Sequence, residues 1–145
     1  MAGAPTAIGF AAFAGVKAIG YTAASAVLKR GYQALAPVKT SVITVGLTRT
    51  GIGLVAGLIY GGLWILVGNQ MRLQESEKLF VYYYVFLLPV RLAEWTFLIW
   101  LFFDRTLHDR SRLWKYVIFG TICSYVLDAI GVGAAFVVPG GFWVC

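Results

Sequence analysis

The chain has 145 residues, of which 60% are hydrophobic and 12% are charged, and its mean hydropathy is +0.80. A soluble domain carries about 25% charged residues, so this composition excludes a soluble globular fold, and the long apolar runs exclude a disordered chain. The net charge of +6 comes mostly from short links between the apolar runs, which is typical of orientation signals in membrane proteins. We therefore expect one all-α integral membrane domain over residues 1–145 and no nucleic-acid partner.

The first apolar run predicts a membrane-spanning helix over about residues 5–28, because about 20 apolar residues are enough to cross a bilayer. Small side chains recur at every fourth position of this run, at Ala14, Ala18, Thr22 and Ala26. Such a row leaves one helix face flat enough for another helix to pack closely against it in lipid. Lys17 lies near the middle of the same run, where an unpaired charge is costly.

The second apolar run is longer than a bilayer crossing requires. We expect Pro37 to open a helix whose residues 37–47 lie in the interface and whose residues from about 48–68 cross the membrane. Arg49 then lies near one membrane face, where its long side chain can extend to the surface. Glycines repeat at every fourth position of this span, at Gly53, Gly57 and Gly61. This repeat predicts a groove for close helix packing, filled by another helix of the chain or of a second subunit.

Two further runs predict a third span over about residues 79–103 and a fourth over about residues 114–138. The third span contains Arg91 and Glu94, which are three residues apart and therefore share one face of a helix. The fourth span contains Asp128. Charged side chains persist inside a membrane only where other groups satisfy them, so these three residues should point into the bundle.

The basic residues in the short links determine the expected orientation. The first link contains three and the third contains four, whereas the second contains two that are offset by two acidic residues. Links one and three are therefore expected in the cytoplasm, with both termini outside, as in a bacterial-type inner (plasma) membrane. Short links favour an up-down antiparallel bundle of four transmembrane helices. The third link also supplies candidates for binding lipid headgroups, namely Arg105, Arg110, Arg112 and Lys115.

In this topology four ionisable residues lie about 10–15 residues from the outer ends of their spans, a slab roughly 8 Å thick near the midplane. They are Lys17, Arg91, Glu94 and Asp128. Two are basic and two are acidic, so the predicted set is formally neutral. We expect Lys17 to meet Asp128 or Glu94, and Arg91 to hold the remaining acid because its planar fork binds a carboxylate at two points.

Chemistry-bearing residues are sparse outside this set. His108 is the only histidine, and it lies with Asp104 and Asp109 in the third link, where solvation is a simpler interpretation than metal binding. The sequence contains no metalloprotease, phosphate-loop or nucleophile-elbow motif. We therefore predict no catalytic residue, no metal, no cofactor and no enzyme activity.

The sequence favours a non-enzymatic multi-pass membrane subunit. Its Gly and Ala helix faces and its midplane charges would serve assembly in the lipid bilayer, with copies of itself or with other membrane subunits. An alternative is a small oligomeric channel or a proton- or ion-coupled transporter that uses Glu94 and Asp128, because a buried carboxyl group can carry a proton. A third interpretation gives the buried pairs only a structural role, in which they fix helix register.

Overall fold

The computed structural model describes residues 7–33, 39–71 and 78–135, and every regular element within these ranges is a helix. The helices are α1 (Ala7–Gln33), α2 (Val42–Met71), α3 (Lys78–Phe102) and α4 (Arg110–Ala135). Each contains a segment long and apolar enough to cross a membrane, and these segments are Gly9–Gln33, Val42–Leu63, Tyr82–Phe102 and Arg110–Gly131. The expectation of an all-helical protein with four candidate membrane spans is thus confirmed for the described part of the chain.

Two helix starts differ from the sequence prediction. The apolar segment of α2 begins at Val42, six residues before the expected crossing over 48–68, and Pro37 lies outside the described residues. Helix α4 begins at Arg110, four residues before the expected 114. Asp109 explains this early start, because its Oδ1 accepts a hydrogen bond from the backbone N–H of Arg112 at 3.0 Å. Such a cap satisfies one of the free N–H groups in a first helical turn.

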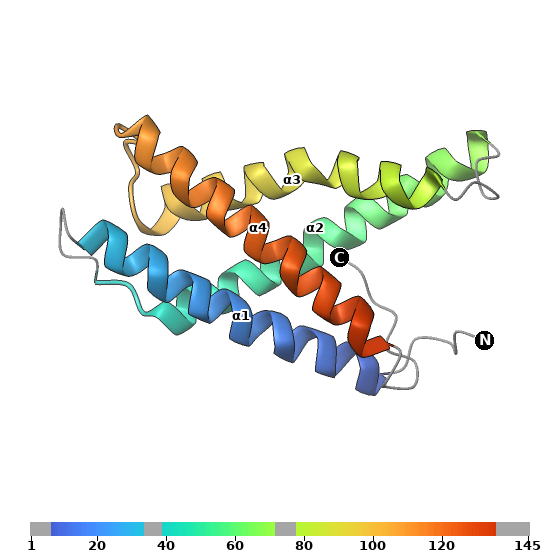
Figure 1. Cartoon of the computed structure of the whole chain (residues 1–145), viewed down its shortest axis with the longest axis horizontal. Coiled ribbons are helices and arrows are strands. Elements are labelled where there is room, and N and C mark those ends of the chain that lie inside the picture. The colour runs from blue at the N-terminus through green and yellow to red at the C-terminus, as the bar shows by residue number, and fades with distance from the viewer. Residues whose placement is uncertain (1–6, 34–38, 72–77, 136–145) are drawn as a thin grey trace.

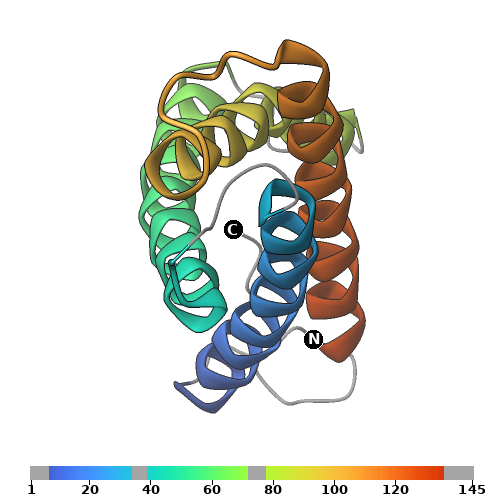
Figure 2. The same cartoon turned by 90° about the vertical axis from the view of Figure 1, so that its left-hand side faces the viewer.

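The helices pack in a ring in which each contacts its neighbours in sequence and α4 returns to α1. Figure 1 shows the C-terminal ends of α1 and α3 at the same end of the molecule as the N-terminal ends of α2 and α4, and Figure 2 shows α1 beside α4. Aromatic rings hold this end together, since the ring of Tyr32 lies 5.4 Å from Phe103 and 5.3 Å from Tyr116. Towards the other end, the hydroxyl of Tyr125 donates a hydrogen bond to the carbonyl of Tyr84 at 2.8 Å.

The interior and the exterior of the ring differ from those of a soluble protein. The apolar core consists of Tyr21, Ala24, Leu28, Tyr32, Val45, Trp95, Leu98, Ile99, Val117 and Leu127. Charged and hydroxyl side chains are buried beside this core, while large apolar side chains face outward, among them Ile19 at 75% exposure and Leu58 at 68%. Water disfavours so much exposed apolar surface and lipid does not, so the exterior agrees with a membrane location.

Candidate functional site

Five charged side chains meet in the middle of the ring, and every helix contributes at least one of them. We call them the charge network, which consists of Lys17 (α1), Arg49 (α2), Arg91 and Glu94 (α3), and Asp128 (α4). Their side chains are between 0% and 6% exposed. On insertion scales a single unpaired charge at a membrane centre costs about 2.5–3.5 kcal/mol, so five buried charges require mutual pairing.

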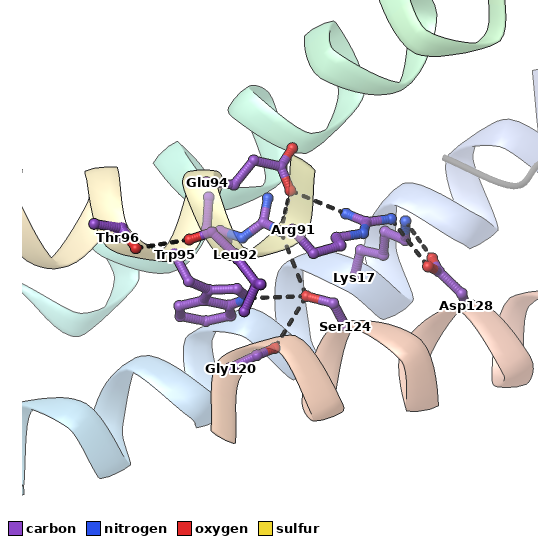
Figure 3. Close-up of polar contacts among 10 residues, drawn as sticks. Lys17, Arg91, Leu92, Glu94, Trp95, Thr96, Gly120, Ser124 and Asp128 are labelled. Carbon is purple, nitrogen blue, oxygen red and sulfur yellow. Dashed lines mark hydrogen bonds and ion pairs between the residues drawn. The ribbon is translucent and has the colours of Figure 1, made fainter. Parts of the chain in front are cut away.

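Asp128 holds one half of the network, because each of its carboxylate oxygens meets a different cation. Lys17 Nζ lies 2.7 Å from Oδ1, and Arg91 Nη2 donates a hydrogen bond to Oδ2 at 2.9 Å (Figure 3). The expected contact between Lys17 and one of the two acids is therefore present. This carboxylate ties α1, α3 and α4 together at one point.

Glu94 holds the other half. Its Oε2 accepts hydrogen bonds from Arg49 Nη2 at 2.7 Å and from Arg91 Nη1 at 3.3 Å. The second contact lies within α3, whose three-residue spacing puts both side chains on one face. Arg91 thus donates to both acids and joins the two halves, while Arg49 brings α2 into the network.

The guanidinium of Arg49 is also held between aromatic rings. Its Cζ atom lies 4.7 Å from the ring centroid of Tyr21 and 5.1 Å from that of Trp95. A planar, weakly hydrated cation is stabilised by such ring faces, and a contact of this kind contributes up to about 2 kcal/mol when it is desolvated. The aromatic contacts therefore help to keep this charge at 0% exposure.

Ser124 connects the charge network to the apolar core. Its hydroxyl accepts a hydrogen bond from Trp95 Nε1 at 2.9 Å and donates one to the carbonyl of Gly120 at 3.1 Å (Figure 3). Arg49 Nη2 also approaches this hydroxyl, at 3.4 Å. The indole of Trp95 packs directly against Gly120, where a side chain would collide with the ring. Gly120 therefore positions Trp95, which in turn lies against Arg49.

The sequence prediction of this set was incomplete. It included Lys17, Arg91, Glu94 and Asp128, and the structure brings all four together. The expectation that Arg49 reaches the membrane surface is wrong, because this residue is fully buried and pairs with Glu94. The four predicted members are two cations and two carboxylates, and Arg49 adds a third cation to them. The signal that could have identified Arg49 was its position inside a long apolar run.

Helices α1 and α2 pack closely at a glycine outside the predicted repeat. A Cβ at Gly46 would lie 2.7 Å from the Cα of Thr22, so only glycine permits this crossing. Thr22 belongs to the predicted small-residue row. The other members of this row, which are also half-buried, are Ala14, Ala18 and Ala26. In the predicted glycine repeat, Gly53 and Gly57 are buried, whereas a Cβ at Gly61 would have nothing within 4 Å.

The predicted headgroup-binding residues lie at the end of the ring where α4 begins. Arg105, Arg110 and Lys115 are exposed, and Arg112 is half-buried. A polar recess of about 280 Å³ lies beside them, lined by Gly31, Asp109, Ser111, Arg112, Lys115 and Tyr116. Two of the four basic side chains thus share one concave surface.

The carboxylates of the link between α3 and α4 bind their own backbone. Asp104 Oδ1 accepts hydrogen bonds from Thr106 N at 2.9 Å, from Thr106 Oγ1 at 2.6 Å and from Leu107 N at 3.1 Å. The hydrogen bond from the Thr106 hydroxyl, with those from the backbone, lowers the pKa of Asp104 below its usual value. This turn holds the backbone of Leu107 at a φ of 49°, a value that residues other than glycine rarely adopt. Among the described residues, no three His, Cys, Asp or Glu side chains converge as metal ligands.

Comparisons of this chain with protein family models, with curated proteins and with solved structures find no match.

Proposed function

We propose that this chain is a non-enzymatic integral membrane subunit, folded as an up-down bundle, that assembles in the lipid bilayer with copies of itself or with other membrane subunits. The four apolar helices support the membrane location. The excess of basic residues in the first and third links supports an orientation with both termini outside, as in a bacterial-type inner membrane. The basic recess with Arg112 and Lys115 would then face cytoplasmic lipid headgroups.

The observation that carries this proposal is the contrast between buried charges that pair within the chain and an open face on α2. The charges pair within one chain, so their role in assembly is to fix the shape of the subunit. On α2, Gly51 and Gly62 point away from the ring, and a Cβ at either position would have nothing within 4 Å. They are eleven residues apart, or three helical turns, and therefore share one face. Glycines on an outer face permit close contact with a second membrane helix.

The test measures the mass of the protein in mild detergent by native mass spectrometry. Wild type is expected as an oligomer or with a copurified partner. The double substitution Gly51→Leu and Gly62→Leu should release the single chain by steric exclusion, with little change in its thermal unfolding midpoint because neither side chain meets its own fold. Gly15→Leu is the matched control, since Gly15 also faces open space but lies on α1. A monomeric wild type contradicts assembly, and an unchanged complex in the double variant contradicts the α2 face.

A channel or a proton- or ion-coupled transporter is the second candidate, because both Glu94 and Asp128 belong to one network that reaches every helix. A change in the charge of either acid would alter the ion pairs that join all four helices. Liposomes containing the wild-type chain and a pH-sensitive dye separate the two proposals. A subunit without transport activity should leave an imposed proton gradient as stable as it is in protein-free liposomes. Faster dissipation, slowed by Glu94→Gln in a folded variant, favours transport.

A further inference from the structure

The polar recess beside the start of α4 lies where two candidate membrane spans end. Gly31 of α1 and four residues from the first two turns of α4 line it, together with Asp109. The apolar segments of these helices are Gly9–Gln33 and Arg110–Gly131. Lys115 lies about 8 Å from Arg110 along the helix axis, and the headgroup layer on each side of a bilayer is about 5–8 Å thick. In a membrane crossed by these segments, the recess therefore lies at the depth of the lipid headgroups.

Arg112 and Lys115 bring two positive charges to the recess, and Asp109 brings one negative charge. The carboxylate satisfies Arg112 only in part, because its Oδ1 accepts from a backbone N–H and its Oδ2 lies 3.6 Å from Arg112 Nε, beyond hydrogen-bond distance. Arg112 Nη1 has no hydrogen-bond partner among the described residues. Residues 104–115 contain four basic side chains and two acidic ones, so the surroundings of the recess also attract an anion.

The recess continues into an apolar row on the same face of α4. Ser111 and Lys115 are four residues apart, and Ile118 and Ile122 follow at spacings of three and four, so these four residues share one helix face. Ile118 is 50% exposed and Ile122 is 57% exposed. This face is therefore polar in its first turns and apolar beyond them. A phospholipid has the same order of parts, a charged headgroup followed by acyl chains.

We propose that the recess binds the phosphate of one anionic phospholipid, whose acyl chains lie along Ile118 and Ile122. Arg112 and Lys115 attract the phosphate by charge, and the hydroxyl of Ser111 donates a hydrogen bond to it. The site deepens the headgroup role in the proposed function and rests on that membrane location, but it needs no partner subunit.

The size and the charge of the recess restrict the ligand further. Its volume of about 280 Å³ is below the roughly 300–1,000 Å³ of pockets that enclose a drug-sized molecule, so it fits a headgroup and not a whole lipid. A phosphate monoester carries nearly two negative charges at pH 7, and the carboxylate of Asp109 repels the second one. A singly charged phosphodiester such as phosphatidylglycerol is therefore the favoured ligand.

The experiment measures lipid binding to the full-length, delipidated protein in mild detergent by native mass spectrometry. Wild type should bind one phosphatidylglycerol about tenfold more tightly than phosphatidylcholine with the same acyl chains, because the two cations repel the choline ammonium. Arg112→Gln and Lys115→Gln should each remove most of this preference. Arg110→Gln is the matched control, since it removes the same charge from the first turn of α4 outside the lining, and it should keep the preference.

Two further measurements separate a lipid from a free phosphate. Inorganic phosphate in large excess should not displace phosphatidylglycerol, because it lacks the acyl chains. Ile118→Asn should weaken the binding of both lipids about threefold, since a polar side chain then interrupts the apolar row. Ile130→Asn is its control, because Ile130 is equally exposed but lies near the other end of α4.

The thermal unfolding midpoint of each lipid-free variant shows whether it is folded, and Lys115→Gln changes only an exposed side chain. The proposal is wrong if wild type binds both lipids equally, if Arg110→Gln loses the preference as fully as Lys115→Gln, or if inorganic phosphate displaces the lipid. A monomeric wild type that keeps the preference contradicts assembly alone. An oligomer without the preference contradicts this lipid site alone.

Discussion

The protein uses carboxylates in two regions, and each region gives them different partners. In the middle of the ring, Glu94 and Asp128 each bind two cations, most of them from other helices. At the end of the ring, Asp104 and Asp109 chiefly accept hydrogen bonds from backbone N–H groups of the link and of the first turn of α4.

The difference follows from the surroundings of the two regions. Removing a carboxylate from water costs several kcal/mol. In a low-dielectric interior, the attraction to a cation at hydrogen-bond distance offsets this desolvation cost. The link remains in contact with solvent, so its carboxylates keep part of their hydration and a few N–H groups satisfy the rest. The interior pairs therefore determine how the helices meet, whereas the link acids determine where one helix ends and the next begins.

The largest expected effect comes from Asp128→Asn. The amide cannot neutralise Lys17 and Arg91, so each of these buried cations loses one carboxylate partner, and Arg91 keeps only Glu94. Breaking a buried ion pair in this way costs about 3–5 kcal/mol, which we expect as the loss in free energy of unfolding measured by titration with sodium dodecyl sulfate. Asp109→Asn is the matched control and should cost about 0.5 kcal/mol or less, because asparagine is also a good cap and the side chain is 48% exposed. Equal losses in the two variants would contradict the comparison between the regions.

The fold was predictable to the extent that apolar length determines it. Four runs of sufficient length specified four helices, and the cost of charge in lipid specified that Arg91, Glu94 and Asp128 point inward. Both inferences depend on the length and the charge of single segments. They can therefore be made without knowing which helix packs against which.

The missing parts of the site depend on packing. The sequence predicts that the crossing part of this helix starts at residue 48 and so places Arg49 near the surface, but the apolar segment of α2 starts at Val42. Six residues correspond to about 9 Å along a helix, which is enough to move this side chain from the interface towards the midplane. Gly46 was missed for a related reason. A single glycine gives no repeating pattern in the sequence. Its lack of a side chain becomes necessary only where α1 crosses α2.

Arg49→Lys sharpens the comparison by keeping the buried charge while changing its shape. Lysine can still pair with Glu94 but loses the planar contacts with Tyr21 and Trp95. We expect a loss of about 1–2 kcal/mol in the same unfolding titration, smaller than that of Asp128→Asn because no carboxylate is left without a cation. Arg30→Lys, at the exposed end of α1, should have no measurable effect. If Arg49→Lys is equally neutral, the aromatic contacts contribute nothing and the charge alone holds α2.

The smallest effect concerns pH and Asp104. Its pKa is lowered in the folded protein, so the folded state prefers the charged form and gains stability wherever that form is populated. This contribution is fully present above the unfolded value of about 3.9 and is lost as the pH falls through the lower folded value. Asp104→Asn cannot titrate, and it should be less stable than wild type by about 0.5 kcal/mol at pH 7, with the difference shrinking towards zero in acid. Subtracting the two unfolding free energies at each pH cancels every contribution that the two chains share. A difference that grows in acid would mean that the folded protein prefers the protonated form, and the link would then resemble a buried site rather than a solvated one.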